Sequence, residues 1–487
     1  MASGRGVRLG WDNWEGFGRN DMLSTRLIEE LSAALGPGGL MLGQDIPERH
    51  GTDWSGMTPI PPLALARPST PEQVAAVMRI CHGFNQPVTP QGGLTGLVGG
   101  ARPSPGSVAL SLERLVGVEA VDAATSTLTV LAGTPLQRAQ EAAQEAGLFL
   151  ALDIGSRGSC TIGGNLATNA GGNRVLRYGM ARDLVLGLEA VLPDGTVVNS
   201  MNRMVKNNTG TDLKQLFIGS EGTLGIITRA VLKLHPRPRT NLNAFVRAPD
   251  FAAVIAFLNL GHERLGGTIS SFETMWPSFY NLVVERMPEV RAPLAAGDGI
   301  NVLLEMAGWD PESDAERFER FLAEALEGSL LTDAVIAKSE QETRSFWAIR
   351  HAGSEYPRIL GEITSFDISF PADQLGDIVV EAEAALRARW PQINALSYGH
   401  VGDGNIHLVV NLPSADRQPK EEISDIVYAI TGRHGGSISG EHGIGTRKLP
   451  YLGYSRDASE IALMRLLKTT IDPKNLLNPG KMLPLEA

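Results

Sequence analysis

Glycine is concentrated in three short segments of this chain, and their bare backbone limits the available folds more than any other feature. QPVTPQGGLTGLVGG (86–100) has five glycines between Gly92 and Gly100, and GSRGSCTIGGNLATNAGGNRVLRYG (155–179) has seven. LFIGSEGTLGIITRAVLKL (216–234) places further glycines before a β-branched strand. Glycine lets backbone amides approach an anion closely. A single loop of this kind is compatible with a mobile surface loop, but several between strands indicate a backbone that wraps around a large polar ligand.

The residues around these loops predict the local structure that presents them. STPEQVAAVMRICHGFN (69–85) has the spacing of an amphipathic helix, with Ser69 or Thr70 as N-cap and Pro71 at the first position. Strands joined at Asp194–Gly195 follow the second segment. No G-x-G-x-x-G lies between a strand and a helix and no G-x-x-x-x-G-K-[ST] occurs, which argues against a Rossmann NAD site and a P-loop.

Composition restricts the class of protein. A chain of 487 residues predicts two or three domains, and a net charge of −11 without a basic run argues against nucleic-acid binding. The two cysteines, Cys81 and Cys160, are too few for a disulfide framework or a cysteine-based zinc site, which fits a reducing cytoplasm. Neither a signal-peptide core nor a membrane-spanning segment is evident. We expect a cytoplasmic protein, with peripheral attachment to a membrane left open.

Two of the nine histidines bracket a turn signal in GHVGDGNIH (399–407). If Asp403 and Gly404 form a two-residue hairpin turn, His400 pairs directly with His407. Paired residues share a face of the sheet, so the two imidazoles would converge on one point, as a metal site requires. The pattern is also compatible with two idle surface histidines.

Six motifs, taken in order, resemble a known family. They are PQGGLTGLVGG, CTIGGNLATNAGG, GSEGTLGIIT, SYGHVGDGNIH, SGEHGIG and LLNPGKML. The three glycine segments resemble the FAD-binding domain of the vanillyl-alcohol-oxidase superfamily. The whole set resembles the FAD-linked D-2-hydroxy-acid dehydrogenases, which include D-lactate dehydrogenases, D-2-hydroxyglutarate dehydrogenases and the catalytic subunit of glycolate oxidase. The resemblance runs from about Asp53 to Leu483.

The resemblance implies which residues bind FAD. The first loop would supply amides to the pyrophosphate, from Gly92, Gly93, Leu94, Thr95 and Gly96. The second would line the flavin and ribityl chain, with Thr161, Gly163, Gly164, Asn165, Ala167 and Thr168. The adenosine end would lie against Gly222, Gly225 and Ile226, and Asn478 would contact the isoalloxazine. Neither glycine loop holds a histidine, and Cys160 is not at a tethering position, so we expect non-covalent FAD.

The resemblance also gives meaning to Glu441 and His442 in GSISGEHGIGTRK. With His400 and His407, Glu441 would complete a set of two imidazoles and one carboxylate, which leaves coordination positions open as in a catalytic divalent metal site. Zinc is the first choice, with manganese, cobalt or iron as alternatives. The ion would hold a 2-hydroxy acid and lower the pKa of its hydroxyl, while His442 accepts the proton as general base. Histidines that merely pack a hairpin are the alternative.

A carboxylate substrate also needs a fixed cation. Arg350 in RSFWAIRHAGSEY (344–356) lies among apolar residues at helical spacing, and it occupies the position of the family's carboxylate-binding arginine. Ser354 would follow one helical turn later on the same face. An ordinary ion pair of Arg350 with Glu342 or Glu355 is the alternative.

The predicted fold class is α+β. A helical lead-in (1–55) precedes a FAD-binding domain of the vanillyl-alcohol-oxidase type (56–238), which HPRPRT joins to the next domain. A substrate or cap domain (240–430) follows, with helical and strand patterns that suit an antiparallel sheet backed by helices. The segment 431–487 would return to the flavin, so the active site is expected between the domains.

The function that we expect is oxidation of a D-2-hydroxy acid to the 2-oxo acid, with hydride transfer to flavin N5. An electron-transfer flavoprotein, a quinone or a cytochrome would take the electrons, and we expect a homodimer. A metal-dependent hydrolase and an inactive FAD-binding subunit are the alternatives.

The substrate prediction depends on two positions. D-2-hydroxyglutarate dehydrogenases of the family carry a lysine in the strand after the arginine helix, where this chain has Ser365, and an asparagine where it has Val409. A buried second carboxylate without a partner is costly. The prediction is therefore a D-lactate-like acid with a small or apolar side chain, with D-2-hydroxyglutarate or D-malate as the alternative if Arg358 or another cation replaces the lysine.

Overall fold

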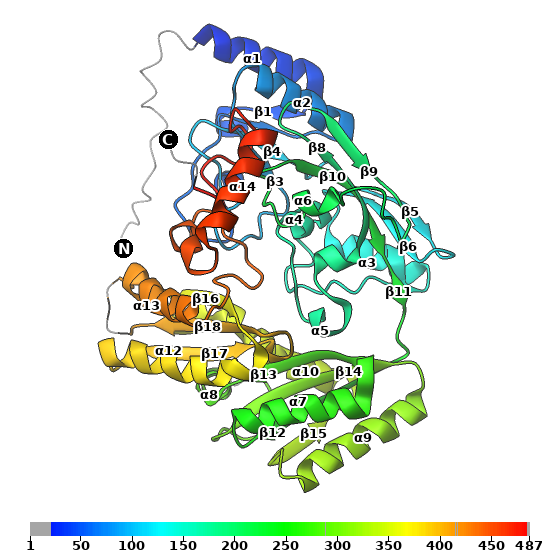
Figure 1. Ribbon diagram of the computed structural model, residues 1–487, viewed down its shortest axis with the longest axis vertical. Coiled ribbons are helices and arrows are strands. Elements are labelled where there is room, and N and C mark those ends of the chain that lie inside the picture. The colour runs from blue at the N-terminus through cyan, green and yellow to red at the C-terminus, as the bar shows by residue number, and fades with distance from the viewer. Residues whose placement is uncertain (1–20, 288, 414, 416, 485–487) are drawn as a thin grey trace, which may run out of the picture.

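The computed structural model describes residues 21–287, 289–413, 415 and 417–484, and these form two domains with a cavity between them (Figure 1). The predicted N-terminal lead-in is described from Asp21, and its first twenty residues lie outside the described part of the chain. Within that part, no helix combines the length and the apolar character needed to cross a membrane.

Two sheets form the frame of the first domain. A four-stranded sheet has the order β1-β2-β4-β3, and a five-stranded antiparallel sheet has the order β5-β6-β10-β8-β9. The four strands of the first sheet are β1 (Leu40–Met41), β2 (Ala64–Ala66), β3 (Val88–Gln91) and β4 (Val108–Ser111). Those of the second are β5 (Val118–Asp122), β6 (Thr127–Leu131), β8 (Val185–Val191), β9 (Val197–Ser200) and β10 (Ile226–Lys233).

Helices complete this domain, and one of them confirms its predicted start. They are α1 (Asp21–Leu35), α2 (Pro71–Gly83), α3 (Leu136–Glu145), α4 (Ile162–Ala167), α5 (Val175–Tyr178) and α6 (Lys214–Phe217). Helix α2 begins at Pro71, with the Thr70 side chain accepting a hydrogen bond from the Gln73 amide, as the capping pattern predicts. The strands β7 (Leu148–Phe149) and β11 (His235–Pro236) pair with each other just before the chain enters the second domain.

The second domain is one seven-stranded antiparallel sheet of order β15-β12-β14-β13-β17-β18-β16, which confirms the predicted α+β class. Its strands are β12 (Thr240–Ala248), β13 (Ile269–Met275), β14 (Ile300–Gly308), β15 (Asp333–Ile336), β16 (Thr364–Ser369), β17 (Asn394–Gly399) and β18 (Asn405–Asn411). Its helices are α7 (Phe251–Leu265), α8 (Pro277–Arg286), α9 (Pro311–Glu327), α10 (Glu340–His351), α11 (Tyr356–Leu360), α12 (Leu375–Arg389) and α13 (Lys420–Arg433).

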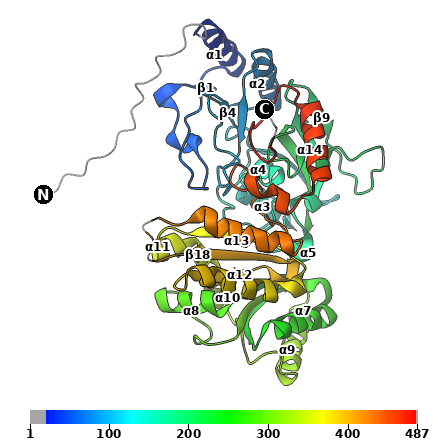
Figure 2. The ribbon, with the colours of Figure 1, turned by 60° about the vertical axis from the view of Figure 1, so that its left-hand side comes forward.

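The alternation of side chains along these strands gives the sheet two different faces. On β18, Ile406, Leu408 and Val410 belong to the core that the sheet shares with α7, α9, α12 and α13. Figure 2 shows α12 and α13 lying along β18. His407 and Val409 alternate with them and belong to the opposite face, where the cavity opens beside the smaller core of α8 and α10. The sheet therefore presents His407 and Val409 to the cavity from a rigid strand.

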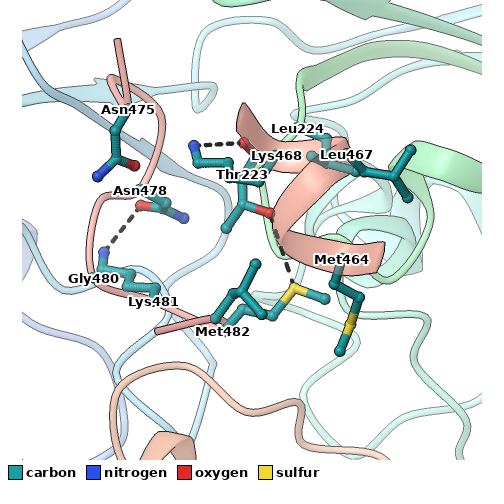
Figure 3. Close-up of a pocket in the computed structure, with 11 residues that line it drawn as sticks. Thr223, Leu224, Met464, Leu467, Lys468, Asn475, Asn478, Gly480, Lys481 and Met482 are labelled. Carbon is teal, nitrogen blue, oxygen red and sulfur yellow. Dashed lines mark hydrogen bonds between the residues drawn. The ribbon is translucent and has the colours of Figure 1, made fainter. Parts of the chain in front are cut away.

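The last part of the chain leaves the second domain and returns to the first. Helix α14 (Ala458–Ile471) lies beside the first domain in Figure 1, and Leu477 is part of that domain's core. A bridge pairs Leu477 with Val88 of β3. A cavity of about 50 Å³ between α14 and the final loop is lined by Thr223, Asn478 and Lys481, among others (Figure 3). It has room for little more than water.

Candidate active site

A cavity of about 1000 Å³ between the domains collects nearly all the predicted site residues. Every residue predicted to bind FAD lines it: Gly92, Gly93, Leu94, Thr95, Gly96, Thr161, Gly163, Gly164, Asn165, Ala167, Thr168, Gly222, Gly225, Ile226 and Asn478. From the cap and C-terminal segment it is lined by Arg350, Ser365, His400, His407, Val409, Glu441 and His442. The volume and the glycine-rich wall suit a large cofactor together with a small acid.

The glycines in the wall are needed because loops pack directly on one another. A Cβ at Gly93 would lie 2.0 Å from the Ser159 carbonyl oxygen, and a Cβ at Gly163 would lie 2.6 Å from the Ala132 Cβ. Thr161 caps α4 by accepting a hydrogen bond from the Gly164 amide. Around Gly93 and Gly163 the wall presents closely packed backbone, which fits the phosphates and ring system of FAD.

The C-terminal segment closes this wall. The Asn478 amide donates to the Val88 carbonyl at 2.9 Å, and the Asn478 side chain donates to the Glu221 carbonyl at 2.7 Å. The Glu221 carboxylate accepts from the amides of Ile444 and Gly445 at 2.6 and 2.8 Å. Burial raises the pKa of Glu221 against these hydrogen bonds. The loop that carries Glu441 and His442 is thereby fixed to the FAD-binding domain.

His400 and His407 lie close together, although the predicted direct pairing of the two residues across the hairpin was wrong. His407 pairs with Tyr398, not with His400, because residues Val401–Asp403 form a 3-10 turn and Gly404 takes the left-handed conformation with φ of 81°. This longer connection replaces the two-residue turn. His400 lies just beyond the end of β17, and its ring centroid is 5.3 Å from that of His407.

Glu441 completes the predicted set of ligands. Its Oε2 lies 3.8 Å from Nε2 of His400 and 4.0 Å from Nε2 of His407. Tetrahedral ligands at about 2.1 Å from zinc are roughly 3.4 Å apart, so a small contraction around an ion would close the set. Burial holds the pKa of His407 well below its ordinary value, so its ring is neutral as a metal ligand must be. The residues therefore fit a divalent metal.

A buried glutamate that the sequence analysis missed lies behind His400. Glu273 of β13 accepts a hydrogen bond from His400 Nδ1 at 2.7 Å, and its side chain is 1% exposed. Burial would raise the pKa of Glu273, but the neighbouring His400 and Arg350 lower it to about 2. Burial lowers the pKa of His400 and Glu273 raises it, with a net increase. The hydrogen bond to Glu273 holds a proton on Nδ1, so Nε2 is the nitrogen that faces Glu441 and would bind an ion after losing its own proton.

A second buried carboxylate, also missed, organises the loop of Glu441 and His442. Asp367 of β16 pairs with His407 across the sheet and is fully buried. It accepts from the amides of Glu441 and His442 at 3.0 and 2.9 Å and lies 3.6 Å from His442 Nδ1. Burial would raise the pKa of Asp367, but His442 and Lys448 hold it well below its ordinary range. His442 lines the cavity beside His407, with ring centroids 6.1 Å apart.

Arg350 has a different partner from the two that the sequence suggested. Its Nε donates to Glu273 at 2.5 Å, and neither Glu342 nor Glu355 pairs with it among the described contacts. The arginine side chain is buried in the cavity wall with its guanidinium carbon 4.8 Å from the Tyr398 ring. Helix α10 ends at His351, so Ser354 lies in a 3-10 turn and not one turn along the same helix; its side chain is outside the described part of the structure.

The two positions expected to determine the substrate are neighbours. Ser365 of β16 pairs with Val409 of β18, and both line the cavity. Arg358, suggested as a replacement cation, is 62% exposed, pairs with Glu289 and Glu355 and is not part of the wall. Arg157 of the second glycine loop does line the cavity, where it pairs with Asp153 at 3.1 Å.

Comparison with known proteins places this site in a family. Residues 62–200 match the profile described as "FAD binding domain", and residues 237–482 match "FAD linked oxidases, C-terminal domain". The mitochondrial D-2-hydroxyglutarate dehydrogenase of Bos taurus is 40% identical over 93% of this chain and 82% of its own. The chain belongs to the FAD-linked D-2-hydroxy-acid dehydrogenase family. It is an FAD-dependent oxidoreductase acting on a CH–OH group.

One further relative and one solved structure are also similar to this chain. A putative mitochondrial D-lactate dehydrogenase of Schizosaccharomyces pombe is 35% identical over 86% of this chain and 81% of its own. The solved structure of p-cresol methylhydroxylase with substrate bound shares only 16% identity but has a TM-score of 0.76, over 96% of this chain and 98% of that chain. This likeness confirms the predicted fold of the vanillyl-alcohol-oxidase type.

The comparisons correct the predicted location. Both curated relatives named above are mitochondrial proteins, which contradicts the cytoplasmic location expected from the sequence. Cysteine content does not distinguish the two locations, because a low content indicates only that disulfides are not needed.

Proposed function

We propose that this enzyme oxidises D-2-hydroxyglutarate, or a closely related D-2-hydroxy dicarboxylate, to the 2-oxo acid. The observation that carries the chemistry is one cavity that joins the glycine loops to His400, His407, Glu441, His442 and Arg350. The dicarboxylate is supported by the mitochondrial relative of Bos taurus, whose name states that substrate. This replaces the D-lactate-like substrate as the first expectation.

The glycine wall would hold FAD non-covalently, and flavin N5 would supply the acceptor for the C2 hydride of the acid. Cys160 is buried, is not among the residues of the cavity wall, and burial raises the pKa of its thiol, so it does not suit a covalent link. A divalent ion, zinc by first choice, would be held by His400, His407 and Glu441 and would polarise the substrate hydroxyl. An electron-transfer flavoprotein, a quinone or a cytochrome is proposed as acceptor, and a homodimer stays a prediction.

The protein's own side chains would bind the substrate and move the proton. Arg350 can hold a carboxylate with its terminal nitrogen Nη1, since Glu273 occupies Nε and Nη2 lies 3.2 Å from His400 Nε2. His442 would accept the hydroxyl proton, and Asp367 beside Nδ1 would stabilise the imidazolium that forms. Arg157, at the cavity wall, is the cation we propose for the second carboxylate in place of the absent lysine.

A D-lactate-like acid is the second candidate, because the pairing of Ser365 with Val409 offers no cation to a distal carboxylate. The name of the relative from Schizosaccharomyces pombe states D-lactate as its substrate.

Kinetics with a panel of acids decides between the candidates. We expect D-2-hydroxyglutarate and D-malate to give a higher kcat/KM than D-lactate and D-2-hydroxyisovalerate, and to bleach the yellow flavin. Arg157→Gln should raise KM for the dicarboxylates at least tenfold and leave D-lactate unchanged, as expected for one lost charged contact. If the monocarboxylates are the better substrates, the second candidate is correct, and Ser365→Lys should then shift preference toward dicarboxylates. A yellow protein that no D-2-hydroxy acid bleaches would contradict both candidates.

A further inference from the structure

Glu273 connects two parts of the site that have separate tasks. One carboxylate oxygen accepts from His400 Nδ1 at 2.7 Å, and the other accepts from Arg350 Nε at 2.5 Å. His400 belongs to the proposed metal set and Arg350 is the proposed carboxylate-binding cation. No other described residue forms a hydrogen bond with both side chains.

The position of Glu273 follows from the register of the sheet. Thr274 pairs with Gly399 between β13 and β17, so the next step of the antiparallel register sets Glu273 across from His400. Phe272, its neighbour on β13, belongs to the helix-covered core, whereas Glu273 belongs to the opposite face. A charged residue on the inward face of a fully buried strand needs compensation, and the Arg350 guanidinium and the Nδ1–H of His400 provide it.

We propose that Glu273 is a positioning residue that fixes the metal ligand and the substrate cation relative to each other. This inference rests on the proposed function, in which His400 binds a metal and Arg350 binds a carboxylate. Without the negative charge, His400 would lose the partner that orients its ring, and Arg350 would lose the contact that fixes its Nε edge. Metal binding by His400 and carboxylate binding by Arg350 should therefore weaken together, although Glu273 would contact neither the metal nor the substrate.

The test uses the holoenzyme and two variants of one residue. Glu273→Gln preserves the shape of the side chain and removes its charge, and Glu273→Asp preserves the charge on a shorter side chain. We expect Glu273→Gln to weaken zinc binding about 10–100-fold, measured by competition with a chromogenic chelator, because partners of metal-bound histidines have effects of that size. KM for the best acid of the panel should rise as well. Glu273→Asp should recover part of both losses, while the FAD content of both variants stays at the level of the wild type.

A matched control separates this role from a general need for a buried carboxylate. Glu189 of β8 is 5% exposed, accepts hydrogen bonds from Thr228 and Asn199, and does not line the cavity. Glu189→Gln should leave zinc affinity and KM unchanged. Equal losses of zinc affinity in the two Gln variants, or unchanged zinc affinity and KM in a folded Glu273→Gln, would overturn the proposal. A wild type that binds no zinc in the competition assay would instead overturn the metal in the proposed function.

Discussion

The two walls of the cavity are built in different ways. The FAD-binding domain contributes backbone, with loops so close that Gly93 has no space for a Cβ. The cap domain and the C-terminal loop contribute ionisable side chains, which are supported by the buried carboxylates Glu273 and Asp367. The first wall should therefore be sensitive to added volume at unchanged charge, and the second to a change of charge at unchanged shape. The two properties can be tested separately.

The largest effect is expected from added volume in the glycine wall. Gly93→Ala should abolish FAD binding, because the new Cβ would meet the Ser159 carbonyl and Cys160 backbone at 2.0 and 2.8 Å. Gly155→Ala is the matched control, since its Cβ would meet no atom within 4 Å although Gly155 lines the same cavity. The ratio of flavin absorbance to protein measures both variants. Equal FAD contents would show that the loops move apart easily, contrary to this account.

Removal of the metal should stop turnover and leave the glycine wall intact. Chelation should abolish oxidation of the best acid with FAD still bound, because the proposed ligands His400, His407 and Glu441 belong to the cap and C-terminal segment rather than to the glycine loops. Activity should return when zinc is added. Full activity in protein shown by elemental analysis to be free of metal would refute the metal site.

A smaller effect is expected from loss of the proton acceptor. His442→Ala should slow flavin reduction by about 10²–10⁴, the usual value of a general base. Substrate affinity should fall much less, because proton removal matters mainly in the transition state. Stopped-flow absorbance separates the two quantities. His434→Ala serves as control, since that exposed histidine pairs with Glu381 away from the cavity, and a rate for His442→Ala close to that of the control would mean that His442 only packs.

The comparison of the walls also explains what could be predicted from sequence. Every residue named from the glycine segments as a FAD contact lines the cavity, because the segments are runs of nearby residues whose spacing is itself the signal. His400, His407 and Glu441 were also found, but the pairing of the histidines was wrong, since residues 401–403 form a 3-10 turn that Asp-Gly alone does not reveal.

Glu273 and Asp367 were missed because their roles depend on neighbours distant in sequence. Glu273 is 127 residues from His400, and Asp367 is 75 residues from His442. A weak local signal existed, since each acid lies between apolar residues in a strand-like run, SSFETMW and ITSFDISFP. Strand alternation suggests that such an acid faces a site, but only the order of strands in the sheet shows which one.

The return of the chain to its first domain has a consequence for synthesis. The Val88 amide donates to the Leu476 carbonyl, and Leu477 lies in the core of the FAD-binding domain. A ribosome makes these residues after the entire cap, so β3 lacks its last neighbour while more than half of the chain is still emerging. The domain that begins first would be finished last, and flavin capture would follow completion of the cap rather than precede it.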